Sequence, residues 1–116
     1  MLVYQDAIKV LCENFPELKD IYDKESDFYI DLPYVFYETE FTKYIMESIQ
    51  KQNIKNLEKA FHFVEKVLQE GDNEFSNMVE VAVLEALFFE GVFDGKGQCW
   101  NLLGKLSKES VEKCKG

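Results

Sequence analysis

Two apolar patterns with helical spacing, joined by a short turn that contains one glycine, constrain the fold of this chain more than any other feature. In the first pattern, apolar residues recur every three or four positions, as along one face of an α-helix: Ile54, Leu57, Phe61, Val64 and Leu68. A second apolar face follows at the same spacing: Phe75, Met78, Val79, Ala82, Val83, Ala86 and Leu87. Between them, Gly71 is expected to end the first helix in the left-handed conformation that glycine adopts without steric cost. So short a turn predicts an antiparallel helical hairpin over residues 54–90, with one shared core of Phe61, Val64, Val79, Val83 and Leu87.

Prolines and capping residues predict the remaining helices. Pro16 and Pro33 suit the first turn of a helix, where the missing N–H costs nothing. Helices are therefore expected over residues 2–13, from 16 to 22, and from 33 onwards, with loops over 23–31 and 91–97. Side-chain caps are expected from Asp31, Asn53, Asp72 or Asn73, and Ser107. Cys99–Leu106 and Ser107–Cys114 add one or two terminal helices, so the fold class is all-α: a single-domain antiparallel helical bundle of about five to six helices over residues 1–116.

The charge balance excludes several classes of partner. The 116 residues carry 22 acidic side chains, 13 lysines and no arginine, for a net charge of −9. A molecule this acidic repels phosphate groups, so neither nucleic acid nor an anionic membrane is an expected partner. The three cysteines form no Cys-x-x-Cys pair, and apolar runs are too short to cross a bilayer. We therefore expect a soluble, cytoplasmic protein with reduced thiols.

Acidic residues gather in two blocks of the sequence. Residues 13–47 hold ten acidic residues against three lysines, and residues 70–94 hold seven against none. Such blocks are either solvated surface or a docking surface for a basic partner, in which carboxylates steer encounter and aromatic side chains supply buried anchors. The first block also contains tyrosines, and its predicted partner-binding residues are Asp23, Glu25, Asp27, Tyr29, Asp31, Tyr34, Tyr37, Glu38 and Glu40. If residues 23–31 are extended, their carboxylates and Tyr29 would face one way, with Phe28 and Ile30 facing the other.

A different partner-binding surface is an open alternative. Val81, Leu84 and Phe88 form a second apolar stripe, opposite the main face of the helix over residues 75–90. A helix that is apolar on two sides is usually central in a fold, but the stripe could instead receive a partner helix or peptide. That arrangement would suit an acidic adaptor or regulatory protein.

The sequence contains no convincing motif for catalysis, metal binding or phosphate binding. The carboxylates of residues 23–31 resemble a calcium loop, but Phe28 stands where that loop needs glycine and Tyr34 where it needs glutamate. His62 has Glu58 and Glu65 nearby on its helix but shares its face with lysines, so a solvated histidine is expected. The run from Gly91 to Gly97 departs from a phosphate-binding loop in spacing and context. We expect no enzyme activity, no catalytic residues, no metal site and no cofactor.

One segment resembles a family of small bacterial helical proteins. In Leu57–Phe89 an amphipathic helix ends at a Gly-Asp turn, after which an asparagine opens an apolar helix carrying a glutamate, here Asn77 and Glu85. The tail from Leu102 to Ser107 is also similar. Related proteins serve as immunity partners in contact-dependent growth inhibition and other polymorphic toxin systems. The resemblance implies a protein that binds and neutralises a cognate toxin domain, commonly a basic nuclease, by occluding its active site.

The acidic charge permits one more interpretation, in which the protein is an acidic mimic of nucleic acid.

Overall fold

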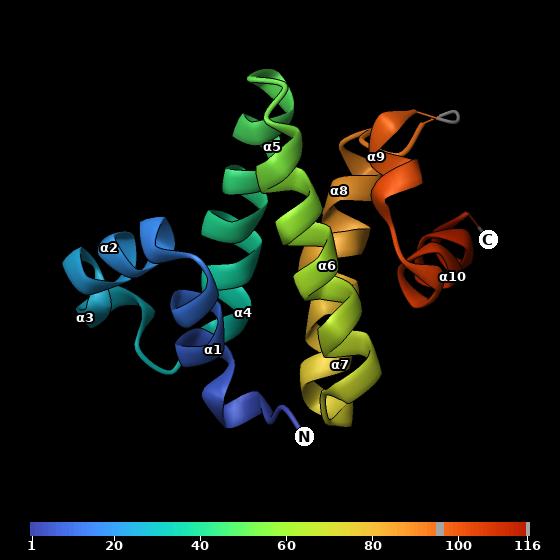
Figure 1. Ribbon diagram of the computed structural model, residues 1–116. Coiled ribbons are helices and arrows are strands. Elements are labelled where there is room, and N and C mark those ends of the chain that lie inside the picture. Colours follow the sequence, from blue (N-terminus) through green and yellow to red (C-terminus); the bar gives the residue numbers. More distant parts are fainter. Residues whose placement is uncertain (95–96, 116) are drawn as a thin grey trace.

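The hairpin predicted over residues 54–90 lies at the centre of the computed structural model, which describes residues 1–94 and 97–115 (Figure 1). Helix α6 (Ile54–Glu70) runs antiparallel to a continuous helix made of α7 (Asn73–Val79), the π-helical segment η3 (Glu80–Glu85) and α8 (Ala86–Phe89). The five residues expected in its core are all fully buried. The periodicity of the sequence therefore predicted this hairpin and its inner face correctly.

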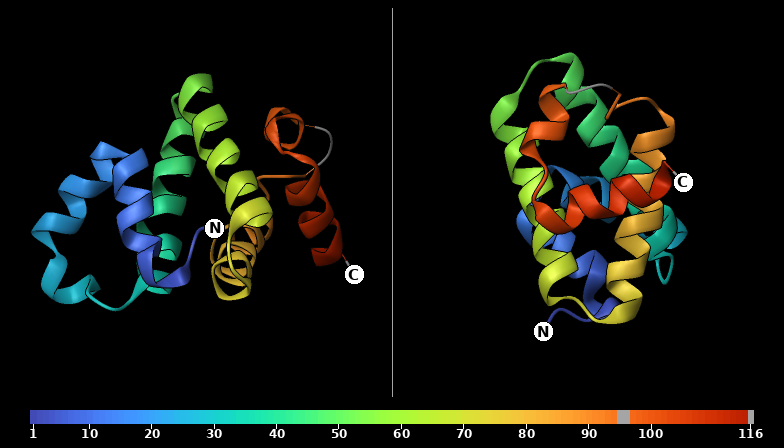
Figure 2. Two further views of the ribbon diagram at one scale, coloured as in Figure 1. Left: turned by 60° about the horizontal axis from the view of Figure 1, so that its bottom comes forward. Right: turned by 90° about the vertical axis from the view of Figure 1, so that its right-hand side faces the viewer.

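The other helices flank the hairpin on two sides (Figure 2). They are η1 (Tyr4–Asp6), α1 (Ala7–Asn14), α2 (Pro16–Lys24), α3 (Ser26–Tyr29), α4 (Pro33–Phe36), η2 (Tyr37–Phe41), α5 (Thr42–Gln50), α9 (Gln98–Leu102) and α10 (Lys105–Cys114). The helix formed by α4, η2 and α5 packs against α6 and lies between it and most of α1–α3, although Phe15 at the α1–α2 junction contacts Phe63 of α6; α9 and α10 cover the opposite side. The all-α prediction is confirmed: the described residues form no strand, and their eight continuous helices slightly exceed the expected number.

Two π-helical segments, η2 and η3, pack against each other in the middle of the bundle. A π-helix takes in more residues per turn than an α-helix, so the residues that follow rotate relative to an α-helical pattern. Leu84 in η3 is fully buried, on a segment against which both η2 and α10 pack, while Val81 remains partly exposed. The stripe of Val81, Leu84 and Phe88 is therefore not one exposed face.

The helix ends follow the predicted caps at two positions. The Asn53 side chain accepts a hydrogen bond from the Asn56 N–H at 3.1 Å and so caps α6. Asp72 caps α7 through the Phe75 N–H at 2.8 Å, and its second carboxylate oxygen accepts from the Tyr4 N–H at 3.1 Å. Asp72 thus holds the N-terminal segment against the turn of the hairpin.

Gly71, in the turn of the hairpin, was predicted to be left-handed, but the left-handed glycine is Gly91, at the end of the hairpin. Gly71 has φ −78°, and glycine is needed there because a Cβ would lie 2.6 Å from the Val67 carbonyl oxygen. Gly91 has φ +78° and ends α8. Its N–H binds the Phe88 carbonyl at 3.0 Å, and the Val92 N–H binds the Leu87 carbonyl at 3.1 Å, which together form a Schellman motif.

Two other predicted caps are wrong. Asp31 precedes α4 but offers no cap; its backbone has φ +62°, a left-handed conformation that aspartate tolerates better than most residues. Ser107 does not begin a helix, because α10 already starts at Lys105 and Ser107 is fully buried in its first turn. A carboxylate from α6, that of Glu65, binds the exposed amides of that turn instead.

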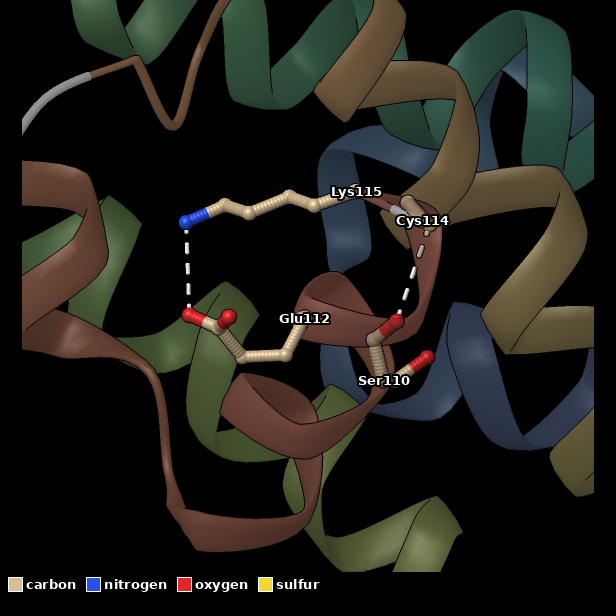
Figure 3. A network of polar contacts seen from close by, with 4 residues as sticks. All are labelled: Ser110, Glu112, Cys114 and Lys115. Atoms are coloured by element: carbon tan, nitrogen blue, oxygen red, sulfur yellow. Dashed lines mark hydrogen bonds and ion pairs between the residues drawn. The ribbon is translucent and has the colours of Figure 1, made fainter.

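Polar contacts attach α10 to the bundle. The Ser107 hydroxyl donates to Glu65 at 2.9 Å, and the Ser110 hydroxyl donates to Glu80 on η3 at 2.8 Å. At the end of α10, Lys115 pairs with Glu112 at 3.2 Å and the Cys114 thiol lies 3.6 Å from the Ser110 carbonyl oxygen (Figure 3). Of these four contacts, the first two connect α10 to α6 and η3, in addition to the backbone hydrogen bonds to Glu65 and the packing of the fully buried Val111.

Candidate partner-binding site

A groove of about 740 Å³ opens between η1, α1, α2, the connection from α3 to α4 and the start of α4. Figure 2, left, shows the arrangement of α1, α2 and α3 and the chain that leads from α3 into α4. Because the groove lies on the side of α4 and α5 away from the central hairpin, the hairpin contributes nothing to its walls. The site belongs to residues 4–33 alone.

The groove has apolar walls and a charged rim. Its walls are formed by one side chain or more from each surrounding element: Tyr4, Ile8, Cys12, Tyr22, Ile30 and Pro33. Its rim carries two lysines and three carboxylates: Lys9, Glu13, Lys19, Asp23 and Asp31. Lys19 and Asp23 pair with each other at 2.7 Å on α2. The groove therefore combines an apolar interior with polar groups at its edge, the usual composition of a binding site.

Exposed apolar side chains gather beside this groove. Four of them fall within eight residues of the chain, with 59%, 59%, 41% and 37% of their surface exposed: Phe28, Ile30, Leu32 and Val35. Single exposed apolar residues are ordinary on a protein surface, whereas a contiguous exposed apolar patch is typical of interaction sites. The sequence signal for it was the alternation of Phe28, Ile30 and Leu32, which our predicted set of binding residues omitted.

Five of the nine predicted binding residues are carboxylates exposed at or near the groove. Asp23 and Asp31 lie on its rim, while the remaining three are on the adjoining helices: Glu25, Asp27 and Glu38. Within residues 1–94 and 97–115, Asp23 is the only one of the five in an ion pair. The other four leave their charge available to a cationic partner.

Two of the predicted tyrosine anchors are core residues. Tyr37 is fully buried and its hydroxyl donates to the Ala7 carbonyl at 2.7 Å, while burial raises its pKa well above the ordinary range. Tyr29 is 4% exposed and donates to Glu40 at 2.6 Å; burial and this hydrogen bond raise its pKa to about 12. Their prediction as partner contacts is wrong, because the helices carrying them turn these rings inward. Glu40 and Tyr34 are half-buried.

The predicted loop over residues 23–31 is also wrong. Helix α2 continues to Lys24, and α3 occupies Ser26–Tyr29, so the extended arrangement of this segment does not occur. Tyr29 faces the core while Phe28 and Ile30 face solvent. The surface next to the carboxylates is therefore more apolar than the sequence pattern indicated.

A second, smaller hollow of about 330 Å³ lies between η3, α8 and α10. Val81 and Phe89 line it and are 39% and 72% exposed, respectively. Glu80 on its rim already accepts the Ser110 hydroxyl. This surface replaces the stripe of Val81, Leu84 and Phe88 as the alternative docking site.

Comparison of the chain with models of protein families identifies its family. A model described as "Domain of unknown function (DUF7674)" matches residues 8–115, which is nearly the whole chain. The chain belongs to the DUF7674 family. No curated protein and no solved structure matches it. Since the match covers residues 8–115, the domain of this family contains the central hairpin and all of the groove except Tyr4 and Gln5.

The residues considered for chemistry lie apart in this DUF7674 domain. His62 is exposed on α6, and no group of three or more potential metal ligands occurs in the described part of the chain. Cys12, Cys99 and Cys114 are free thiols, and burial raises the pKa of Cys12, at the groove, to about 11. Lys96 and Gly95 of the supposed phosphate loop lie outside the described residues. Among the helices that the structure describes, none is both long and apolar enough to cross a membrane.

Proposed function

We propose that this protein is a cytoplasmic immunity protein that binds a cognate basic toxin domain and neutralises it by occluding the active site. One observation carries the proposal: residues 23–38 combine exposed apolar side chains with exposed carboxylates, of which all but Asp23 make no ion pair within residues 1–94 and 97–115. The two kinds of group have separate uses in binding a basic protein. The resemblance of Leu57–Phe89 to immunity proteins supports the same function.

The carboxylates would act before contact and the apolar groups after it. Long-range attraction between a protein of net charge −9 and a basic domain raises the rate of encounter. Burial of side chains such as Phe28 and Ile30 then supplies affinity, because large apolar groups at the centre of an interface contribute most of the binding energy. An acidic protein held in this way also covers the cleft with which a nuclease binds phosphate groups.

Inhibition of this kind needs a stable surface and no reactive group. The groove has a thiol, Cys12, as its one nucleophile of note, and the raised pKa keeps that thiol protonated near neutral pH. The histidine of the chain, His62, is on α6 and does not line the groove. We therefore propose a binding protein rather than an enzyme.

An adaptor that receives a helix or peptide is the second candidate, and the exposure of Phe89 and Val81 favours it. Its docking surface would be the hollow between η3, α8 and α10. The two candidates differ in which surface binds, so the same set of variants separates them.

Co-expression in cells tests the proposal. Where a neighbouring gene encodes a large secreted protein, its variable C-terminal domain is the toxin candidate and is produced with or without the full chain. We expect the chain to restore growth, and the Glu25→Lys/Asp27→Lys variant to lose most of that protection. Glu74→Lys/Glu90→Lys is the matched control, since it also reverses two exposed carboxylates but on the second acidic block.

The structure guides the choice of these positions. Asp31 is avoided because its left-handed backbone disfavours lysine, and Glu80 because it binds Ser110. If the control variant loses protection and Glu25→Lys/Asp27→Lys keeps it, the interface lies on the second block and the adaptor surface is favoured. Absence of protection by the unaltered chain against this domain would reject the immunity function.

A further inference from the structure

We infer that the groove between α1, α2 and the α3–α4 connection receives one apolar side chain of the partner, Phe or Leu, from a segment with lysine or arginine on both sides. This inference rests on the proposed function and deepens it, because it assigns the surface and the chemistry of the contact. The occupant is a protein segment, since the groove offers walls for an apolar side chain and carboxylates for flanking cations.

The size and lining of the groove suit an inserted side chain. Its volume of about 740 Å³ lies in the range of ligand-binding pockets. Ile8 and Tyr22 stand on the two facing helices, α1 and α2, and both also pack against the core, which holds them in place. An apolar group that enters between them is removed from water against apolar side chains.

Ile30 marks the mouth of the groove. It lines the groove and yet is 59% exposed, so a side chain placed beside it would remove apolar surface of both molecules from water. Phe28 is equally exposed but does not line the groove. The two residues therefore form a matched pair in which only one is expected to contact the inserted side chain.

Charge complementarity identifies the flanking residues of the partner. Of the rim lysines, Lys19 pairs with Asp23, which leaves the two carboxylates of Glu13 and Asp31 and the one ammonium of Lys9 on the rim. Glu25 and Asp27 lie just beyond the rim in the chain and add negative charge. Cations on both sides of the apolar side chain would therefore meet carboxylates, whereas an acidic segment would be repelled.

Short peptides test this inference directly. The probes are acetylated and amidated Lys-Lys-X-Lys-Lys peptides with X as Phe, Leu, Gly or Asp, titrated into the ¹⁵N-labelled full chain and followed by chemical shifts. We expect the Phe and Leu peptides to bind at least about tenfold more tightly than the Gly peptide, because burying one such side chain contributes that much. The largest shifts should fall on residues 8–12, 22–23 and 30–31.

Variants at the mouth supply the control. Ile30→Ser should weaken the Phe peptide at least about fivefold, and Phe28→Ser should change its affinity less than twofold. Equal binding of the Phe and Gly peptides, or shifts centred on residues 81–89, would overturn the inference. If Ile30→Ser leaves protection in cells intact while Glu25→Lys/Asp27→Lys removes it, the groove inference fails and the proposed function stands.

Discussion

The carboxylate of Glu65 on α6 binds Ser107 on α10 twice, accepting from its backbone N–H and from its hydroxyl, each at 2.9 Å. The same carboxylate accepts from the Leu106 N–H at 3.1 Å. A side chain 42 residues away in the sequence thus satisfies the free amides at the start of α10, the role that a local capping residue usually has. Glu65 is only 9% exposed, so these hydrogen bonds are shielded from water.

Replacing Glu65 should therefore destabilise the protein. Glu65→Ala leaves two backbone donors and a buried hydroxyl without their acceptor, and we expect the free energy of unfolding to fall by about 2–3 kcal/mol. Urea unfolding followed by circular dichroism measures this. Glu58→Ala, which removes an exposed carboxylate from the same helix, should change it by less than about 0.5 kcal/mol. Similar losses for the two variants would contradict the capping role.

The same carboxylate should make stability depend on pH. Burial by itself raises the pKa of Glu65, but hydrogen bonds from Ser107, Leu106 and Gln69 outweigh it, and the pKa is lowered from the ordinary 4.5. A carboxylate with a lowered folded-state pKa contributes stability above its unfolded pKa and loses it as pH falls through the folded value. The stability difference between the unaltered protein and Glu65→Gln should thus be full above about pH 5 and shrink below 4.5. A difference that stays constant from pH 7 to about pH 3 would contradict this assignment.

Two large apolar side chains near the end of the hairpin should respond very differently to truncation. Leu87 is fully buried, and Leu87→Ala should cost about 2–5 kcal/mol through lost burial and the cavity left behind. Phe89, two residues later, is 72% exposed, and Phe89→Ala should cost less than about 0.5 kcal/mol. Chemical unfolding of both variants tests which side of the helix after η3 faces the core. A larger loss for Phe89→Ala would mean that this helix is rotated.

The glycine of the Schellman motif should resist substitution. Gly91→Ala places a Cβ on a backbone with φ +78°, and we expect a loss of about 1–2 kcal/mol in the free energy of unfolding. Gly97, with φ −76° and no atom closer than 3.8 Å to an added Cβ, should accept alanine without loss. Thermal unfolding of the two variants compares them. Equal midpoints would argue against the left-handed turn at Gly91.

If the partner is basic, its association rate should depend on salt. Charge steering weakens as the screening length falls from about 10 Å at 0.1 M to about 3 Å at 1 M salt. We expect the association rate constant to drop at least about tenfold over this range, with a smaller change in the dissociation rate. Stopped-flow fluorescence of a labelled partner measures both. Glu25→Lys/Asp27→Lys should slow association chiefly at low salt; equal rates at both salt concentrations would argue against steering by these carboxylates.

Local pattern determined the central hairpin, the helical class, the starts of helices at Pro16 and Pro33, and the caps at Asn53 and Asp72. Each of these depends on residues within a few positions of one another, because apolar periodicity, proline and side-chain caps act within one or two helical turns. The inner face of residues 75–87 was predictable for the same reason. The abundance of exposed carboxylates was likewise evident from composition, since charged groups are rarely buried without partners.

Tertiary packing decided the remainder. The π-helical segments, the burial of Tyr29 and Tyr37, and the capping of α10 by Glu65 all depend on neighbours that are far apart in the chain. The groove is the clearest case, because Ile8, Tyr22 and Ile30 come from three segments and meet only when α1–α3 fold against α4 and α5. A helical pattern tells which side of a helix is apolar, but only the packing of several helices decides which apolar side chains are left for a partner.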